Sequence, residues 1–284
     1  MSTRPIFAFF GHHKCATMSL NTILGSICRR IGLRHAALFN SGQFDGDLAG
    51  YCDEHKVDFL LYGNANMTYV KSLPAHRGVH IIRDPRDIVV SAYFSHLHSH
   101  PTHAWPELEA HREKLGSMSQ EEGLAEEIKF RNKSFSHMAE WDYAQDHVLE
   151  IRFESFIKSS YEILLTAFQH MSLVDESTLG YRNRFRNAAR EVLSSLRKHS
   201  GCNLLPYRSG RQIHASELLA LNWRHRFEAR SKGRSQGDED VRNHYRKGRA
   251  GDWTNYFTPD LKKVFKNHYS GLVPQLGYAP SDDW

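Results

Sequence analysis

The chain has 284 residues, a formal net charge of +5, and a composition that is 40% hydrophobic and 24% charged. These values exclude a disordered or fibrous chain, and the length suffices for one large α/β domain with insertions. No apolar run approaches the length of a membrane span, and the one at the N-terminus is too short for a signal peptide. The four cysteines contain no C-x-x-C pair, so they indicate neither a zinc site nor a disulfide framework and favour a reducing, cytoplasmic setting: Cys15, Cys28, Cys52 and Cys202.

The first patterned stretch is IFAFFGHHKCATMSLNTIL, residues 6–24. Residues 6–10 predict a buried strand that ends at Gly11, and apolar residues spaced by three and four after position 19 predict a helix. A strand, a tight turn and a helix direct backbone N–H groups and the positive helix end at an anion. Lys14 would add a mobile cation, and Thr17 and Ser19 could cap the helix or donate to phosphate. The spacing G-x-x-K-x-x-T lacks the Gly-Lys-Ser/Thr order of a nucleotide-triphosphate loop.

Residues 33–56 are polar and contain several glycines, and we expect a loop with at most a short helix there. The run VDFLLY, residues 57–62, predicts a second buried strand. In open α/β sheets the carboxyl ends of the strands line the ligand crevice, so residues 63–68 are candidates for contacting a substrate.

The second patterned stretch is VHIIRDPRDIVVSAYFSHLH, residues 79–98. It predicts a short strand over 79–82 and a helix that begins at Asp84, because proline is tolerated in the first helical turn. Arg83 could form a forked contact to a phosphate, and Ser91 could donate to the same group. The alternative is that Arg83 pairs with Asp84 or Asp87.

The segment near 95–123 is predicted to be a charged surface insertion, with its histidines more often solvated than facing a pocket. Helical spacing follows over 124–141, then a strand over 148–153 and a second helix over 154–171. A second insertion near 175–240 is rich in arginine, which most often marks a solvated helix face; binding of an anionic acceptor is the alternative. No pattern typical of nucleic-acid binding occurs.

The third patterned stretch is YRKGRAGDWTNYFT, residues 245–258. The cations Arg246 and Lys247 and the bare backbone of Gly248 could close over an anion, whereas the roles of Asp252, Trp253 and Asn255 are predicted to be structural. Thr258 followed by proline and aspartate predicts the start of a helix.

These three stretches, in this order, resemble the phosphosulfate loop, the R-[DN]-P-[RK]-D-x-x-x-S motif and the R-K-G-x-x-G-D-W-x-N-x-F-T signature of sulfotransferases that use 3′-phosphoadenosine 5′-phosphosulfate (PAPS). The segment RFESF also resembles the R-Y-E-D-L segment of that family. The resemblance implies one sulfotransferase domain over 1–284, with a P-loop-like α/β fold in which helices flank a central parallel sheet. It implies sulfuryl transfer from PAPS to a hydroxyl or, less often, an amine, without a metal, leaving adenosine 3′,5′-bisphosphate (PAP).

The resemblance also assigns roles to residues. Lys14 would contact the bridging oxygen and the 5′-phosphate, Arg83 and Ser91 would bind the 3′-phosphate, and Phe153 would lie by the adenine or simply in the core. The remaining matching positions would form the phosphate cradle and the cover over the 3′-phosphate: Cys15, Ala16, Thr17, Met18, Arg246, Lys247 and Gly248.

The chain departs from the family pattern at three positions. Asn64 stands where a histidine or glutamate base is often found, so His13 becomes the first candidate for the base, followed by His12, Asp45 and His96. Ala16 replaces a glycine, which predicts an ordinary backbone conformation there. Ser19 lacks the tryptophan that stacks on adenine in many members.

Two other functions stay open from the sequence, namely a small-molecule kinase and a PAPS- or bisphosphate-binding protein without catalysis. The acceptor could be a small molecule, a glycan or a lipid, and no pattern indicates an oligomeric state.

Overall fold

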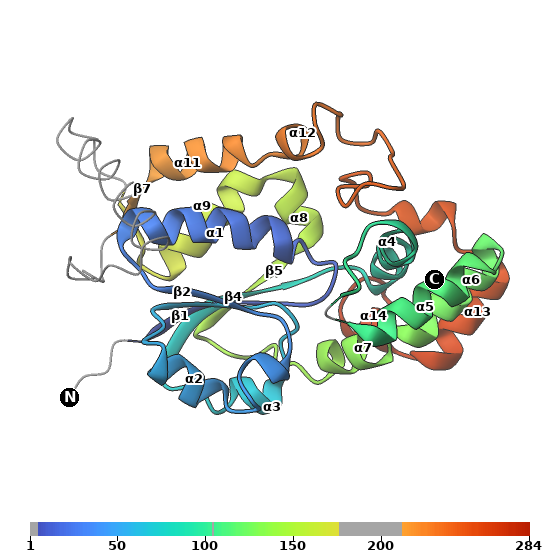
Figure 1. Cartoon of the computed structure of the whole chain (residues 1–284), viewed down its shortest axis with the longest axis horizontal. Coiled ribbons are helices and arrows are strands. Elements are labelled where there is room, and N and C mark those ends of the chain that lie inside the picture. Colours follow the sequence, from blue (N-terminus) through green and yellow to red (C-terminus); the bar gives the residue numbers. More distant parts are fainter. Residues whose placement is uncertain (1–4, 104, 176–211) are drawn as a thin grey trace. The chain divides into compact units, whose positions relative to one another are not determined.

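The computed structural model describes residues 5–103, 105–175 and 212–284. A five-stranded sheet in the order β2-β3-β1-β4-β5 forms its centre (Figure 1). The strands are β1 (Ile6–Gly11), β2 (His35–Leu38), β3 (Phe59–Tyr62), β4 (His76–Ile82) and β5 (Val148–Arg152). The predicted central parallel sheet is confirmed, because β1 pairs in parallel with β3 and β4, and β2 pairs in parallel with β3.

The strand β1 occupies the middle of the sheet and is almost wholly buried. Its run of apolar residues meets the requirement of a parallel strand that is covered on both faces. β2 was not expected, because the prediction for residues 33–56 was a loop; HAAL is short and only half-buried, and it is a strand because it pairs with β3. This pairing is a long-range contact that local periodicity does not reveal.

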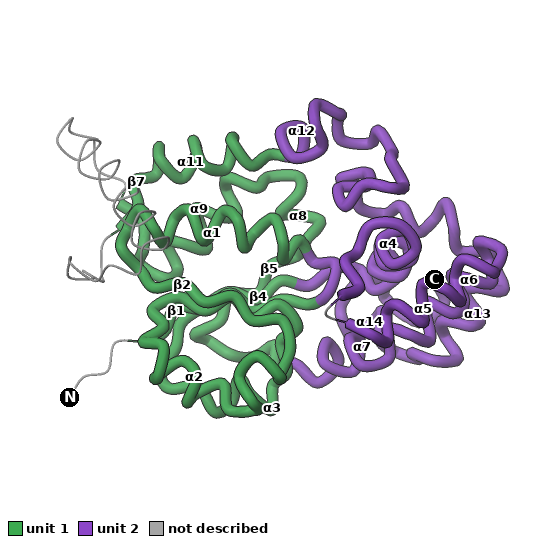
Figure 2. Tube along the Cα trace, in the orientation of Figure 1, with its two compact units in different colours: residues 1–12, 16–81, 142–226 green, residues 13–15, 82–141, 227–284 purple. Residues whose placement is uncertain are grey.

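The chain divides into two compact units, each built from separated segments (Figure 2). The first unit comprises residues 1–12, 16–81 and 142–226 and contains the sheet. Within it, α1, α9 and α11 cover one face of the sheet and α2 and α3 the other (Figure 1). Its further elements are α1 (Thr17–Ile31), η1 (Ser41–Gln43), α2 (Leu48–Glu54), α3 (Met67–Val70), α8 (Phe153–Lys158), α9 (Ser160–His170), β6 (Val174–Asp175), β7 (Ile213–His214) and α11 (Ala215–Arg224).

The second unit comprises residues 13–15, 82–141 and 227–284 and is helical. Its helix α4 begins at the predicted residue, where the Asp84 side chain accepts a hydrogen bond from the Arg86 backbone N–H. Thr258 caps α13 in the same manner, which confirms that predicted start. The elements are α4 (Pro85–His98), α5 (Pro106–Gly116), α6 (Gln120–Phe130), α7 (Asn132–Ala139), α12 (Phe227–Arg230), η2 (Asp252–Asn255), α13 (Pro259–His268) and α14 (Leu272–Gln275).

The segment near 95–123 was expected to be a surface insertion with solvated histidines, and this expectation is wrong for its two central histidines. His96 is fully buried and His111 is 5% exposed. α5 and α6 pack against α4 in this region, and apolar side chains such as Leu108 and Leu124 fill the interface. Of the histidines expected to be solvated, His98 and His103 are indeed exposed.

Two further predictions concern the arginines of the second insertion and membrane-spanning segments. Seven arginines of the second insertion lie outside the described residues: Arg182, Arg184, Arg186, Arg190, Arg197, Arg208 and Arg211. Among the described helices, none combines the length and the apolar character that crossing a bilayer requires.

Candidate functional site

The loop between β1 and α1 is a tight turn in which two residues that are not glycine have positive φ. Lys14 and Ala16 both have left-handed backbones, with φ of 68° and 62°. The expected ordinary conformation of Ala16 is therefore wrong: this tight turn requires positive φ, which an alanine adopts at a cost of about 1 kcal/mol. Turns of this kind direct successive N–H groups to one side, and the first N–H groups of α1 have no acceptor within the helix.

Thr17 begins α1 but does not cap it, because the cap residue is Ala16 and makes no side-chain hydrogen bond. Instead the Thr17 hydroxyl donates a hydrogen bond of 3.1 Å to the backbone carbonyl of His12, and this bond stabilises the turn. Cys15 is buried and Met18 is exposed. The predicted roles of their backbone N–H groups in a phosphate cradle stay predictions.

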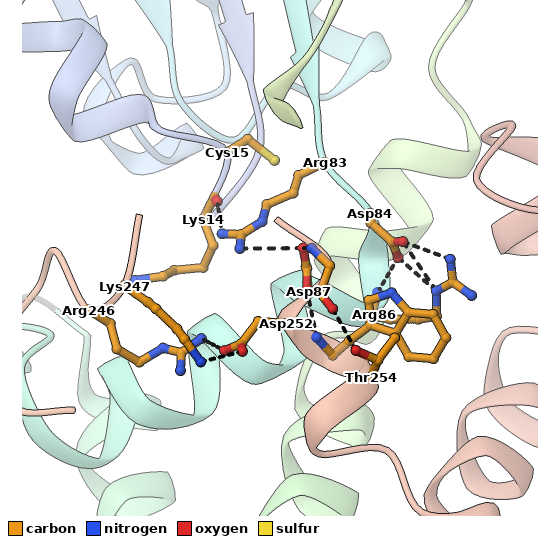
Figure 3. Close-up of polar contacts among 12 residues, drawn as sticks. Lys14, Cys15, Arg83, Asp84, Arg86, Asp87, Arg246, Lys247, Asp252 and Thr254 are labelled. Carbon is orange, nitrogen blue, oxygen red and sulfur yellow. Dashed lines mark hydrogen bonds and ion pairs between the residues drawn. The ribbon is translucent and has the colours of Figure 1, made fainter. Parts of the chain in front are cut away.

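Arg83 follows directly after β4 and lies at the turn that carries Lys14. Its guanidinium donates to the backbone carbonyl of Lys14 over 3.2 Å and lies 3.8 Å from the Asp87 carboxylate (Figure 3). Part of the alternative interpretation of Arg83 thus holds, since it does form an ion pair with Asp87. The same contacts also fix the guanidinium beside Lys14.

Asp87 connects the second patterned stretch to the third. Its two carboxylate oxygens accept hydrogen bonds from the backbone N–H groups of Gly251 and Trp253, over 2.7 and 2.9 Å. The Trp253 ring packs on the guanidinium of Arg86, which donates three hydrogen bonds to the Asp84 carboxylate. Trp253 therefore has the structural role predicted for it.

Arg246 and Lys247 are held by carboxylates. Asp252 accepts from Arg246 over 2.5 Å and from Lys247 over 2.6 Å (Figure 3), and Glu239 forms ion pairs with both cations. Asp252 also accepts from Asn255, as expected for the structural part of this motif. The cations are thus positioned in advance of any ligand.

Lys14 has an unusual electrostatic environment. Burial and, after it, the nearby cations Arg83, Arg131 and Arg246 together lower its pKa from 10.5 to about 7, against the opposing effect of Glu127. Its ammonium group makes no hydrogen bond or ion pair with any residue in the described part of the second unit. An anion at this position would relieve the repulsion among the cations, so the residues present fit a ligand with several phosphate charges.

Gly248 requires the absence of a side chain for two reasons. Its φ is +67°, and a Cβ atom there would lie 2.6 Å from the Phe227 ring. Gly251 also has a positive φ, +78°, but a Cβ there would meet nothing within 4 Å.

We therefore expect Gly248→Ala to lower the free energy of unfolding by about 1–3 kcal/mol more than Gly251→Ala, because only the first combines a strained φ with overpacking. Chemical denaturation of both variants measures the difference. Equal losses would show that the Phe227 ring moves aside at no cost.

Other predicted ligands stay untested by the geometry. Ser91 lies two turns into α4, half-buried, and its hydroxyl makes no hydrogen bond with a described residue of the second unit. Phe153 is the first residue of α8 rather than the last of a strand, and it is 8% exposed within the first unit. Both its adenine contact and a purely structural role are compatible with that burial.

Asn64 and most candidates for the general base either already contact other side chains or backbone groups or lie in an exposed turn. The Asn64 amide donates to the Phe39 carbonyl over 2.7 Å, a structural contact. His12 is 1% exposed and lies 2.9 Å from His80, whose other nitrogen contacts Glu150. Asp45 is exposed in the turn before α2.

His13 belongs to a buried network that sequence reasoning missed. Its Nδ1 lies 2.7 Å from the Arg131 guanidinium, which pairs with Glu127 over 2.8 Å. The other Glu127 oxygen lies 2.9 Å from Nδ1 of His96 and 2.8 Å from Nε2 of His111. The spacing of Glu127 and Arg131 along α6 was the only local signal, and such pairs are usually exposed.

His96, His111 and Glu127 could in principle hold a metal ion, since their ligand atoms lie within 4.8 Å of one another. However, Nδ1 of His96 and Nε2 of His111 are already at hydrogen-bond distance from the Glu127 carboxylate. Arg131 also forms an ion pair with this carboxylate. The three groups therefore satisfy one another without an ion.

No family model and no curated protein matches the chain. Three solved structures resemble it at low sequence identity. The mouse sulfotransferase SULT7A1 with PAP is 16% identical, with a TM-score of 0.47, over 95% of this chain and 86% of that one. A sulfotransferase from Alicyclobacillus acidocaldarius is 13% identical, with a TM-score of 0.33, over 71% of this chain and 98% of that one.

The third is retinol dehydratase in complex with androsterone and the inactive cofactor PAP. It is 13% identical, with a TM-score of 0.51, and the match covers 96% of this chain and 82% of that one. Together with the parallel sheet, this match confirms the predicted fold class: the chain has the fold of a protein that binds PAP.

Proposed function

We propose that this chain is a PAPS-dependent sulfotransferase that transfers a sulfuryl group to a hydroxyl, or less often an amine, of its acceptor. The observation that carries the proposal is the group of cations around Lys14. Arg83 and Arg246, which belong to two further sequence motifs, both lower the pKa of Lys14. The bound PAP in retinol dehydratase, which shares the fold, supports the same ligand here.

The roles of the residues follow from their chemistry. Lys14 would neutralise the charge that develops on the bridging oxygen, with the cradle of N–H groups from Cys15 to Met18 around the 5′-phosphate. Arg83 and Ser91 would bind the 3′-phosphate, and Arg246 and Lys247 would cover it. When bound, PAPS supplies the sulfuryl group, and the chain contributes positioning and charge neutralisation. No step in this scheme requires a metal.

The chemistry of the acceptor beyond its hydroxyl stays open among a small molecule, a glycan and a lipid. A cytoplasmic location remains the prediction from cysteine usage. A PAPS-binding protein without turnover and a small-molecule kinase are the competing functions, and ligand binding separates them.

We expect PAP to bind the wild-type protein in calorimetric titration and Arg83→Ala to weaken that binding by about 10–100-fold, because a charged hydrogen bond contributes about 1.5–3 kcal/mol. Arg77→Ala is the matched control, since Arg77 lies on the same strand β4 with an exposed side chain. It should leave the affinity unchanged.

The same titration with ATP and Mg²⁺ tests the kinase. Binding of ATP with no binding of PAP would overturn the sulfotransferase proposal. Binding of PAP without cleavage of PAPS in the presence of an acceptor panel would favour the non-catalytic binding protein.

A further inference from the structure

Glu127 is the centre of the buried network in the second unit. It is fully buried and contacts Arg131 through one oxygen, and His96 and His111 through the other. Burial alone would raise the pKa of this carboxyl, but its interactions with His96 and Arg131 and the two histidine hydrogen bonds outweigh burial and lower the pKa. Glu127 is therefore a carboxylate at neutral pH and can only accept hydrogen bonds.

The tautomer of His13 follows from its partner. Arginine has only donors, so Nδ1 of His13 must accept the hydrogen bond from Arg131. The neutral ring then carries its proton on Nε2. Burial, reinforced by Arg131, His96 and Lys14, keeps the pKa of His13 well below 6.5, so the ring stays neutral. His13 thus offers an N–H donor at Nε2 and no lone pair, which argues against the base role first considered for it.

The tautomer of His96 is the opposite one. Its Nδ1 faces the Glu127 carboxylate, an acceptor, so the proton lies on Nδ1 and the lone pair on Nε2. The His13 and His96 rings stack with centroids 5.1 Å apart and an interplanar angle of 25°. Both Nε2 atoms are buried, and neither has a hydrogen-bond partner within the described residues. The two stacked rings therefore carry one hydrogen-bond donor and one acceptor that no group in the described part of the chain satisfies.

We propose that His96, oriented by Glu127, is the general base that accepts the proton of the acceptor hydroxyl, and that His13, oriented by Arg131, donates a hydrogen bond to the reacting group. This inference rests on the proposed sulfotransferase function. It identifies a base where Asn64 cannot serve, and it makes Glu127 and Arg131 positioning residues.

The proton transfer balances as follows. The proton of the acceptor hydroxyl passes to Nε2 of His96, and the electron pair of the O–H bond stays on the oxygen, which bonds to sulfur. The pair of the broken sulfur–oxygen bond leaves on the phosphate oxygen of PAP. The resulting imidazolium keeps its Nδ1–H on Glu127, and this carboxylate stabilises the new positive charge.

In the ligand-free protein, burial and the nearby cations disfavour protonation of His96. Burial, together with Arg131 and Lys14, lowers its pKa from 6.5 to about 3, against the opposing effect of Glu127. An anionic ligand beside Lys14 would offset part of the repulsion from these cations and raise the pKa of His96 when it is needed. The rings of His100 and Trp105 also pack against His96, so an acceptor reaches Nε2 only where these rings give way.

The tautomers can be measured without any turnover. Long-range ¹H–¹⁵N spectra of imidazole-labelled protein distinguish a protonated ring nitrogen from a bare one, and the signals are assigned among the nineteen histidines by their loss in His13→Gln and His96→Gln. We expect a proton on Nε2 in His13 and on Nδ1 in His96 at pH 7. A proton on Nε2 of His96 would overturn the proposal. The absence of protons on both Nδ1 of His96 and Nε2 of His111, the nitrogens that face the carboxylate, would also overturn it, because this is the state that metal ligation requires.

The chemical role needs a second measurement, for which cleavage of PAPS is followed with water and with 4-nitrophenol as acceptors. We expect His96→Gln to slow cleavage by about 100-fold or more, as for other general bases, with PAP affinity within threefold of wild type. His98→Gln, an exposed position on the same helix, is the control and should retain wild-type rates. Glu127→Gln should also slow cleavage and give a mixed tautomer at His96.

The outcomes separate the two proposals. Wild-type rates in His96→Gln would overturn the base assignment and leave the sulfotransferase function in place. Wild-type protein that binds PAP but leaves PAPS intact would overturn the base assignment in favour of a non-catalytic binding protein. Absence of PAP binding would overturn the proposed function itself, whatever the tautomers.

Discussion

Raising the pH from 7 to 9 is expected to weaken PAP binding about 50-fold, and the loss is expected to depend on Lys14. The pKa of Lys14 in the ligand-free protein is about 7, because burial and neighbouring cations disfavour its charged form. A bound phosphate favours that form and raises the pKa, so binding above pH 7 requires proton uptake. Each pH unit above the free pKa then costs about tenfold in affinity, up to the pKa of the complex.

Titration calorimetry in two buffers with different ionisation enthalpies measures this uptake. We expect close to one proton to be taken up per PAP bound at pH 8.5 and about half a proton at pH 7. The second ionisation of a phosphate group has its midpoint near pH 6, so it is nearly complete over most of the interval from pH 7 to 9. Lys14→Arg is the control for charge, because an arginine stays protonated throughout, and its affinity should not fall above pH 7.

Two results would contradict this account. Affinity that stays constant from pH 7 to 9 in the wild type would show that Lys14 is charged before PAP binds. An unchanged pH dependence in Lys14→Ala would assign the proton to another group. In either case PAP would bind to the cations around Lys14 without the uptake of a proton by Lys14 that its low pKa predicts.

The sequence predicted the strands and helix starts whose causes are local. The start of α4 at Asp84 and that of α13 at Thr258 were predictable because a capping side chain followed by proline is a signal within three residues. β1 was predictable from its unbroken apolar run. β2 was not, because its strand conformation depends on pairing with β3, more than twenty positions along the chain.

The same distinction applies to the candidate site. Lys14, Arg83 and Arg246 were predicted from motifs, and the structure brings them together in one unit. Ala16 was misjudged because a residue type gives only a preference for its backbone conformation, and this turn overrides it. Glu127 was missed because its role comes from contacts to residues that are 16 and 31 positions away.

Replacing Asp252 by alanine is expected to lower the free energy of unfolding by about 3–5 kcal/mol, the range for removing one member of a buried ion pair. The Asp252 side chain is only 3% exposed, and it accepts hydrogen bonds from both Arg246 and Lys247. Without it, two cations share Glu239 alone, and this carboxylate is more exposed. Asp260→Ala is the control, since Asp260 is exposed in the first turn of α13 and should cost less than about 0.5 kcal/mol.

The effect of PAP on this variant tests where Arg246 and Lys247 act. If these cations face the 3′-phosphate, as proposed, saturating PAP supplies the negative charge that Asp252→Ala lacks. PAP should then raise the melting temperature of Asp252→Ala by more than it raises that of the wild type, because binding to the folded state alone stabilises it. An equal rise in both proteins would place the phosphate away from these cations, and their ion pairs with Asp252 would then serve only to hold residues 245–258 in place.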